Sequence, residues 1–175
     1  AWSVAVLRRE LRDPLPPSEL QITRALEQMQ EVDHSPVSED RMQHLNQVAL
    51  DYYQAHYPHS WSQHHLTTRF GTDLAGHPHL RPGHAPDTWT GLVTHLRRRG
   101  ATDQELTLTG LAAPARTGRL IDRFRDRLIL PITSGGDIIG FVARRHPDTT
   151  DTDHHGPKYL NTARTLLYRK SERLY

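Results

Sequence analysis

Two β-rich runs separated by a glycine pair restrict the fold of this 175-residue chain more than any other feature of its sequence. The first run is RLILPI, from Arg127 to Ile132, and the second is IIGFVAR, from Ile138 to Arg144, with TSGGD between them. Runs rich in aliphatic residues on both sides of a short glycine-containing connection predict an antiparallel hairpin. Pro131 has no backbone N–H to donate to a sheet, so we expect it at a free edge or at a bulge.

Helical patterns dominate the sequence before the hairpin. They predict helices over residues 2–12, 18–32, 38–56 and 60–70, a helix capped by Asp87 or Thr88 that ends at Gly100, and a short helix that starts with a Thr102–Glu105 capping box. The prolines of residues 13–17 predict a linker, and residues 71–86 predict a long loop. The sequence therefore predicts an α+β fold in which a helical N-terminal part packs on a small antiparallel sheet or hairpin.

Charge is distributed unequally along the chain. Residues 1–96 hold 7 Lys and Arg against 11 Asp and Glu, whereas residues 97–175 hold 15 against 9. The basic half is the candidate surface for a polyanion, because Lys and Arg displace counterions condensed on phosphates. The sequence has no apolar run of about 18 residues, which a membrane-spanning helix needs, so we expect a cytoplasmic protein without a membrane partner.

The common signatures of catalytic and metal sites are missing from the sequence. The absence of cysteine excludes disulfides, thiolate nucleophiles and cysteine-based zinc sites. The 13 histidines do not follow a zinc-binding spacing, and no phosphate-binding glycine loop or nucleophile elbow occurs. We therefore predict no catalytic residue, no metal site and no cofactor within these 175 residues.

Two basic segments have alternative interpretations. In RLIDRFRDRLILPI, Arg123, Arg125 and Arg127 would share one side of an extended strand with Asp122 and Asp126 opposite, so they would either contact phosphates or pair with the aspartates. Cations and tyrosines also mix in the last twenty residues, GPKYLNTARTLLYRKSERLY. Such a mixture can bind a flexible single strand of nucleic acid through phosphate contacts and base stacking. A solvated basic tail would have the same composition.

Four motifs follow one another in the basic half: RFRDRLILPI at 123–132, GDIIGFVAR at 136–144, PKYLN at 157–161 and YRKSERLY at 168–175. In this order they resemble RFRxRxxFPI, GxxIGFGGR, PKYLNSPET and FxKxxxLYGL of DnaG-type bacterial primases, in the N-terminal subdomain of the catalytic core. Weaker agreement occurs upstream at DYYQ (51–54), HLTTRF (65–70, against YLxxRG), RPGHAP (81–86) with Trp89, and TGL (109–111). The resemblance covers residues 47–175 and leaves residues 1–46 as a helical N-terminal extension outside it.

The resemblance implies a mixed α/β subdomain that forms one wall of a basic groove for the single-stranded DNA template. The positions that match the template-binding pattern are Arg69, Arg144, Lys158, Tyr159, Asn161 and Lys170. Two departures alter the pattern: Val142 and Ala143 replace glycines, and Arg164 replaces a carboxylate.

The resemblance also implies parts that these 175 residues do not contain. The family pattern continues beyond Tyr175 into a TOPRIM fold, whose carboxylates hold Mg or Mn for primer synthesis. We therefore expect a piece of a longer replication protein, with the TOPRIM fold as a partner in cis and a replicative helicase as a further partner. The piece would bind single-stranded DNA weakly and salt-dependently without making primers alone. The alternative is a non-catalytic single-stranded nucleic-acid-binding or interaction module in a mobile-element replication protein.

Overall fold

The computed structural model describes residues 37–149, 156–163 and 165–168. Its elements, in chain order, are α3 (Glu39–Ala55), α4 (Trp61–Phe70), β1 (Gly83–Ala85), α5 (Gly91–Arg97), α6 (Asp103–Leu108), β2 (Ala112–Pro114), β3 (Leu120–Asp122), β4 (Arg127–Ser134), β5 (Asp137–Arg145) and β6 (Tyr159–Asn161). The helices predicted over 2–12 and 18–32 and the linker between them lie outside the described residues. No helix among the described residues is long and apolar enough to cross a membrane.

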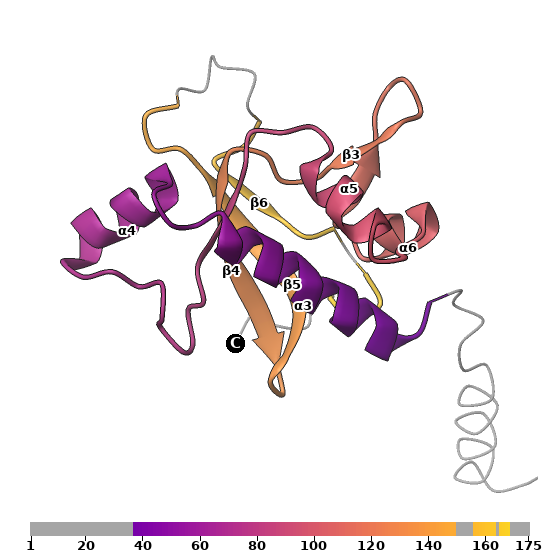
Figure 1. The fold of residues 1–175 in the computed structure, drawn as a ribbon, viewed down its shortest axis with the longest axis horizontal. Helices are drawn as coiled ribbons and strands as arrows, with labels where there is room; N and C mark the ends of the chain where they lie inside the picture. Colours follow the sequence, from indigo (N-terminus) through magenta and orange to yellow (C-terminus); the bar gives the residue numbers. More distant parts are fainter. Residues whose placement is uncertain (1–36, 150–155, 164, 169–175) are drawn as a thin grey trace, which may run out of the picture. The chain divides into compact units, whose positions relative to one another are not determined.

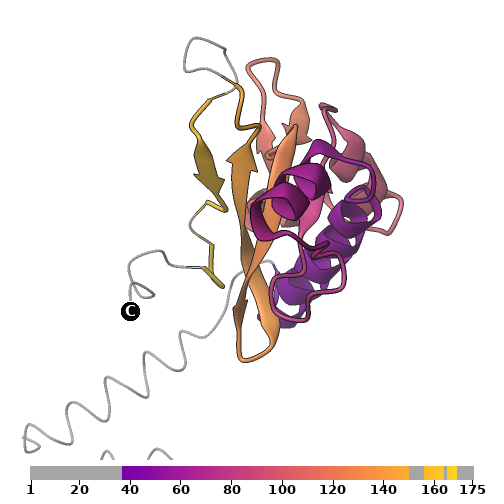
Figure 2. The same ribbon diagram turned by 90° about the vertical axis from the view of Figure 1, so that its left-hand side faces the viewer.

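The predicted α+β fold is confirmed. An antiparallel sheet in the order β1-β4-β5-β6 forms the centre, and β2 and β3 form a separate antiparallel pair. The helix α3 lies across the β4–β5 hairpin in Figure 1, and Figure 2 shows the helices gathered on one side of the sheet. The side chains of β4 and β5 that alternate with those facing α3 belong to the opposite face of the sheet.

The hairpin has the predicted strands and turn. β4 pairs with β5, and the pairing shifts register between Ile132 and Thr133, which marks a β-bulge. Pro131 lies beside this bulge and past Ile129, the last residue of β4 that pairs with β1. The sheet therefore tolerates the missing N–H of Pro131, as the sequence predicted.

The main core lies between α3 and the sheet. The ring of Tyr53 meets the ring of Phe141 edge-on, with their centroids 5.5 Å apart. Asn46 donates a hydrogen bond of 3.0 Å to the carbonyl of Ile138 and so ties α3 to β5. β1 runs so close beneath α3 that a Cβ added to Gly83 would lie 2.6 Å from the Cβ of Tyr53. Only glycine fits this crossing without displacement of the helix.

Three local predictions were wrong. Residues 83–85, expected within a loop, form β1, and α5 begins after Thr90 without a side-chain cap from Asp87 or Thr88. The strand expected through residues 122–127 is interrupted after β3, and Asp126 has a positive φ of 45°. The buried Asp122 carboxylate instead accepts hydrogen bonds of 2.9 Å from the backbone N–H groups of Leu92 and Val93 in α5. Tertiary contacts that a local pattern does not contain decide all three segments.

Candidate nucleic-acid interface

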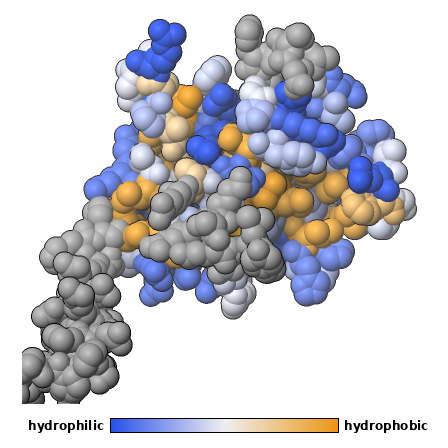
Figure 3. Space-filling model, turned by 180° about the vertical axis from the view of Figure 1, so that it is seen from behind, coloured by the Kyte–Doolittle hydropathy of each residue, from blue (hydrophilic) through white to orange (hydrophobic). Residues whose placement is uncertain are grey.

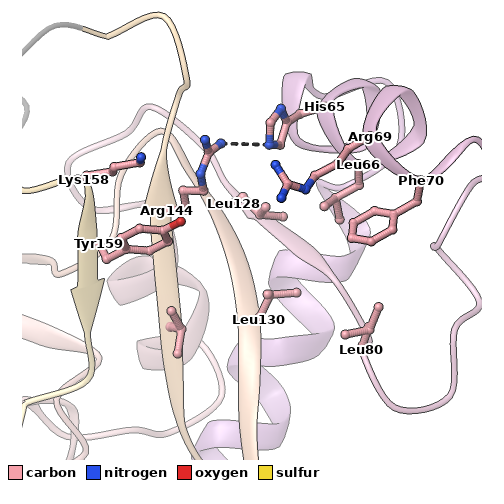
Figure 4. Close-up of a pocket in the computed structure, with 11 residues that line it drawn as sticks. His65, Leu66, Arg69, Phe70, Leu80, Leu128, Leu130, Arg144, Lys158 and Tyr159 are labelled. Carbon is pink, nitrogen blue, oxygen red and sulfur yellow. Dashed lines mark hydrogen bonds between the residues drawn. The ribbon is translucent and has the colours of Figure 1, made fainter.

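Four of the six predicted template-binding residues line one groove on the side of the sheet away from α3. The groove has a volume of about 410 Å³, and its walls include Arg69 from α4, Arg144 from β5, and Lys158 and Tyr159 at the start of β6 (Figure 4). Residues far apart in the sequence thus converge on one surface. Arg69, Lys158 and Tyr159 are exposed, and Arg144 is half-buried.

Strand register explains why these side chains share a face. Arg144 pairs with Tyr159 across β5 and β6, and with Leu128 across β5 and β4. Side chains of directly paired residues lie on the same face of an antiparallel sheet. The alternate residues Phe141 and Ala143 belong to the core beneath α3, so Arg144 and its partners face the opposite way.

The other two predicted residues lie apart from the groove walls. Asn161 pairs with Val142 and so belongs to the same face of the sheet, but it is not among the residues that line the groove. Its backbone carbonyl accepts hydrogen bonds of 3.1 and 2.9 Å from Arg123. Lys170 lies outside the described residues, as does Arg164, and both stay predictions.

The helix α4 contributes two stripes of side chains to the groove. Ser60 caps its N-terminus by accepting a hydrogen bond from the N–H of Gln63, and Gly71 ends it with a left-handed φ of 72°. Residues four apart share a helix face. The pair His65 and Arg69 therefore forms a polar stripe, and the pair Leu66 and Phe70 forms an apolar stripe beside it.

The polar stripe contacts β5 directly. Arg144 Nη1 donates a hydrogen bond of 2.8 Å to His65 Nε2, drawn as the dashed line in Figure 4. A guanidinium can only donate, so His65 must be neutral at Nε2 to accept this bond. Burial lowers the pKa of His65 below its ordinary value, and the positive charges of Arg144 and Arg69 lower it further. His65 therefore orients Arg144 without neutralising its charge.

Apolar side chains form the rest of the groove. They are Leu66, Phe70, Leu80, Leu128, Leu130 and Val142. Leu66 and Leu128 are buried in a small second core with Tyr57 and Leu74, whereas Phe70 is 56% exposed. The groove is thus cationic along one part and apolar along another.

A second basic cavity of about 370 Å³ involves the arginines of the RFR segment. Its lining residues are Asp87, Trp89, Arg123, Arg125, Arg127, Gly156, Pro157 and Leu160. The guanidinium carbon of Arg125 lies 4.2 Å from the ring centroid of Trp89, within cation–π range. In one of the two interpretations of the sequence these arginines pair with Asp122 and Asp126, but the two carboxylates bond elsewhere: Asp122 caps α5, and Asp126 accepts a hydrogen bond of 2.6 Å from the indole of Trp61.

Sequence reasoning did not identify His65, Phe70 or Trp89 as candidate site residues. The sequence offered a way to find His65 and Phe70, because they lie four residues before and one residue after Arg69 on the helix predicted over residues 60–70. Their facing partners on β4 and β5 are set by the tertiary fold alone. Among the residues that the structure describes, no three His, Asp or Glu side chains gather as a metal site.

Comparison with known proteins agrees with this geometry. Residues 52–175 match the family model of the N-terminal domain of the DNA primase catalytic core. The DNA primase of Streptomyces coelicolor is 45% identical over 106 residues, which are 60% of this chain and 16% of that protein. The DNA primase of Deinococcus radiodurans is 36% identical over 135 residues, which are 75% of this chain and 22% of that protein. The matched region is therefore a small part of either relative.

Solved structures extend the similarity to three dimensions. The RNA polymerase domain of Mycobacterium tuberculosis primase DnaG, in complex with a double-stranded DNA oligomer with a 6-nucleotide overhang, has a TM-score of 0.67 and 35% identity, with 77% of this chain and 41% of that chain covered. A DnaG primase catalytic domain bound to single-stranded DNA has a TM-score of 0.59 and 28% identity, with 73% and 40% covered.

Proposed function

The chain belongs to the DnaG-type bacterial DNA primases, and from this premise we propose that it is part of a primase that makes RNA primers on single-stranded DNA, with its groove binding the template strand. The observation that carries the proposal is the convergence of Arg69, Arg144, Lys158 and Tyr159 on one groove. Two solved relatives with this fold are complexes with DNA, which supports a DNA ligand for this surface.

The chemistry of the groove suits an unpaired strand. Its cations attract phosphates, and exposed aromatic rings such as Tyr159 offer a surface on which bases stack. Lys158 Nζ lies 5.8 Å from the ring centroid of Tyr159, so one nucleotide can meet a charge and a ring together. Because these contacts involve phosphates and ring faces, the groove should accept many template sequences.

Primer synthesis itself is proposed to need parts beyond this chain. Phosphoryl transfer of this kind uses divalent metal ions held by clustered carboxylates. The described residues contain no such cluster and do not fit a Mg or Mn ion, so no catalytic step is assigned to them. We propose that a TOPRIM fold in the same polypeptide supplies the metal site, and that a replicative helicase is a further partner of the longer protein.

Oligonucleotide binding tests the template groove. Fluorescence anisotropy with a labelled single-stranded oligonucleotide should show affinity that falls as salt rises. Arg144→Ala and Lys158→Ala should each weaken binding and lower the slope of log K against log salt by about 0.7 for each lost phosphate contact. Arg98→Ala is the matched control, because Arg98 is exposed but does not line the groove. Unchanged affinity and slope in both groove variants would refute the assignment.

Primer-synthesis assays test whether synthesis needs the TOPRIM fold in addition to this chain. The 175-residue chain should give no metal-dependent product, and a product from it would contradict the proposal. A longer protein that includes the TOPRIM fold should make primers. Binding without synthesis in that longer protein would favour the non-catalytic module.

A further inference from the structure

We propose that the apolar part of the template groove, with Phe70 at its rim, is a subsite for one unpaired nucleobase of the bound strand. This inference rests on the proposed template groove and deepens it. The groove combines cations with a continuous apolar wall, and its occupant should combine an anionic group with a flat apolar one.

Phe70 is unusual among the apolar side chains of the described residues. It is one of four large hydrophobic residues there that are exposed, and it shares the groove with another of them, Tyr159. The two rings come from opposite walls, α4 and β6 (Figure 4).

The ring of Phe70 does not stand alone on the surface. Isolated exposed hydrophobic residues are common and need no function. Here the apolar stripe of α4 continues onto Leu80 and onto Leu128 and Leu130 of β4, all of which line the same groove. On the face of the molecule turned away from α3, apolar surface reaches solvent beside hydrophilic patches (Figure 3). Phe70 thus extends an apolar wall that is already present.

The polar stripe of α4 runs parallel to the apolar one. His65 and Arg69 precede Leu66 and Phe70 by one residue each, and the polar stripe meets Arg144 through the hydrogen bond to His65. The sheet also places charged and apolar side chains next to one another, because Leu128 lies opposite Arg144 and Leu130 lies opposite Val142 across β4 and β5. Charge and apolar surface therefore run side by side from the helix onto the sheet.

A nucleotide matches this division. Its phosphate would contact Arg69 and Arg144 while its base packs on Phe70 and Leu130. A volume of about 410 Å³ is within the range of small-ligand sites, which is roughly 300–1,000 Å³. A paired base hides its faces within the duplex stack, so the subsite selects single-stranded over double-stranded DNA.

Abasic oligonucleotides provide the test. A short labelled oligothymidylate is compared with an oligonucleotide of the same length in which abasic residues replace the thymidines, so that the phosphates remain and the bases are missing. Phe70→Ala should weaken binding of the oligothymidylate by about tenfold, a typical loss for one stacked base, and leave binding of the abasic strand unchanged. Phe70→Trp should retain the affinity of the original chain for the oligothymidylate.

Arg144→Ala is the matched comparison, because loss of a phosphate contact should weaken binding of both strands by the same factor. The base subsite is refuted if Phe70→Ala weakens binding of both strands equally or of neither. The same result would follow if another segment of a longer protein covered the apolar wall, and it would refute the subsite in that case too. If the original chain binds neither strand, the template groove itself is refuted. If Arg144→Ala weakens binding and Phe70→Ala does not, the groove stands and only the base subsite fails.

Discussion

Replacement of three glycines by alanine tests how closely the sheet is packed against its neighbours. A Cβ at Gly83 would lie 2.6 Å from the Cβ of Tyr53 and 3.0 Å from its carbonyl carbon. A Cβ at Gly140 would lie 3.0 Å from Oγ1 and 3.1 Å from Cβ of Thr162. At Gly76 nothing lies within 4 Å, and the backbone there is not in the left-handed region. The three positions thus range from a clash with a helix backbone to open space.

The expected magnitudes follow from these distances. Overpacking typically costs about 1–3 kcal/mol, and Gly83→Ala should reach the upper end or exceed it because the helix α3 cannot rotate out of the way as a side chain can. Gly140→Ala should cost less, because Thr162 can shift by a few tenths of an ångström. Gly76→Ala should stabilise the protein by about 0.4–1 kcal/mol through the lower entropy of its unfolded chain.

Urea unfolding followed by circular dichroism measures all three free energies of unfolding. Gly140→Ala has a functional consequence as well, because Thr162 directly follows β6 and its hydroxyl accepts a hydrogen bond of 2.7 Å from the N–H of Phe141. A displaced Thr162 should shift β6 and weaken oligonucleotide binding, whereas Gly76→Ala should leave binding unchanged. Equal stability of the Gly83 and Gly76 variants would show that the described contact between β1 and α3 is wrong.

Three further predictions concern buried and paired polar groups. Asp122→Ala should lower the free energy of unfolding by about 1–3 kcal/mol, measured by urea titration, because two buried N–H groups of α5 lose their acceptor. The hydrogen bond from Arg41 lowers the pKa of Glu105 from 4.5 to about 2. The stability that this contact contributes is present above pH 4.5 and should be lost as the pH falls towards 2. In thermal melts over a series of pH values, Glu105→Gln should remove this loss. Burial lowers the pKa of both His65 and His84, so the folded state resists their protonation. The free energy of unfolding should therefore fall as the pH drops below 6.5. A variant with glutamine at both positions should show a smaller fall over the same pH range.

Local signals in the sequence account for most of the observed elements. The Thr102–Glu105 capping box predicted the start of α6, helical patterns predicted α3 and α4, and the glycine pair predicted the turn between β4 and β5. These features depend on neighbours within a few residues, so a pattern can reveal them. β1 has only three residues, Gly83 to Ala85, and exists because β4 offers it partners 42 to 46 positions away, from Arg127 to Ile129. No local pattern contains that information.

The sequence predicted most residues of the candidate site, but it did not predict how the structure groups them. Family motifs selected Arg69, Arg144, Lys158 and Tyr159, and the structure brings these four to one groove. The sequence treated the arginines of 123–127 as one set on one side of a strand. The break after β3 interrupts that strand, because Asp122 caps the start of α5 and Asp126 turns the backbone through a positive φ, although all three arginines still line the second basic cavity.

Three arginines that are buried or half-buried explain how so short a strand as β6 keeps its place. Arg123, Arg127 and Arg145 donate to the backbone carbonyls of Asn161, Pro157 and Gly156, respectively, with the shortest donor–acceptor distances 2.9, 2.9 and 2.8 Å. Burial lowers the pKa of Arg123 and Arg127 from the ordinary value, as expected for cations that are partly withdrawn from water. Their hydrogen bonds are directed at the chain itself, so they act first as supports for the segment 156–161.

The adjacent residues Arg144 and Arg145 show why this arrangement suits a template groove. They alternate across β5, so Arg145, only 8% exposed, bonds to the segment before β6 while Arg144 faces the groove. The N–H of Arg145 also donates a hydrogen bond of 3.0 Å to the carbonyl of Lys158. One strand thus presents a cation to solvent and, one residue later, fixes the backbone that carries Lys158 and Tyr159. Because a supported backbone positions the groove cations, their side chains are placed to contact phosphates in the proposed template groove, and the neighbouring arginines would serve the fold and this surface in turn.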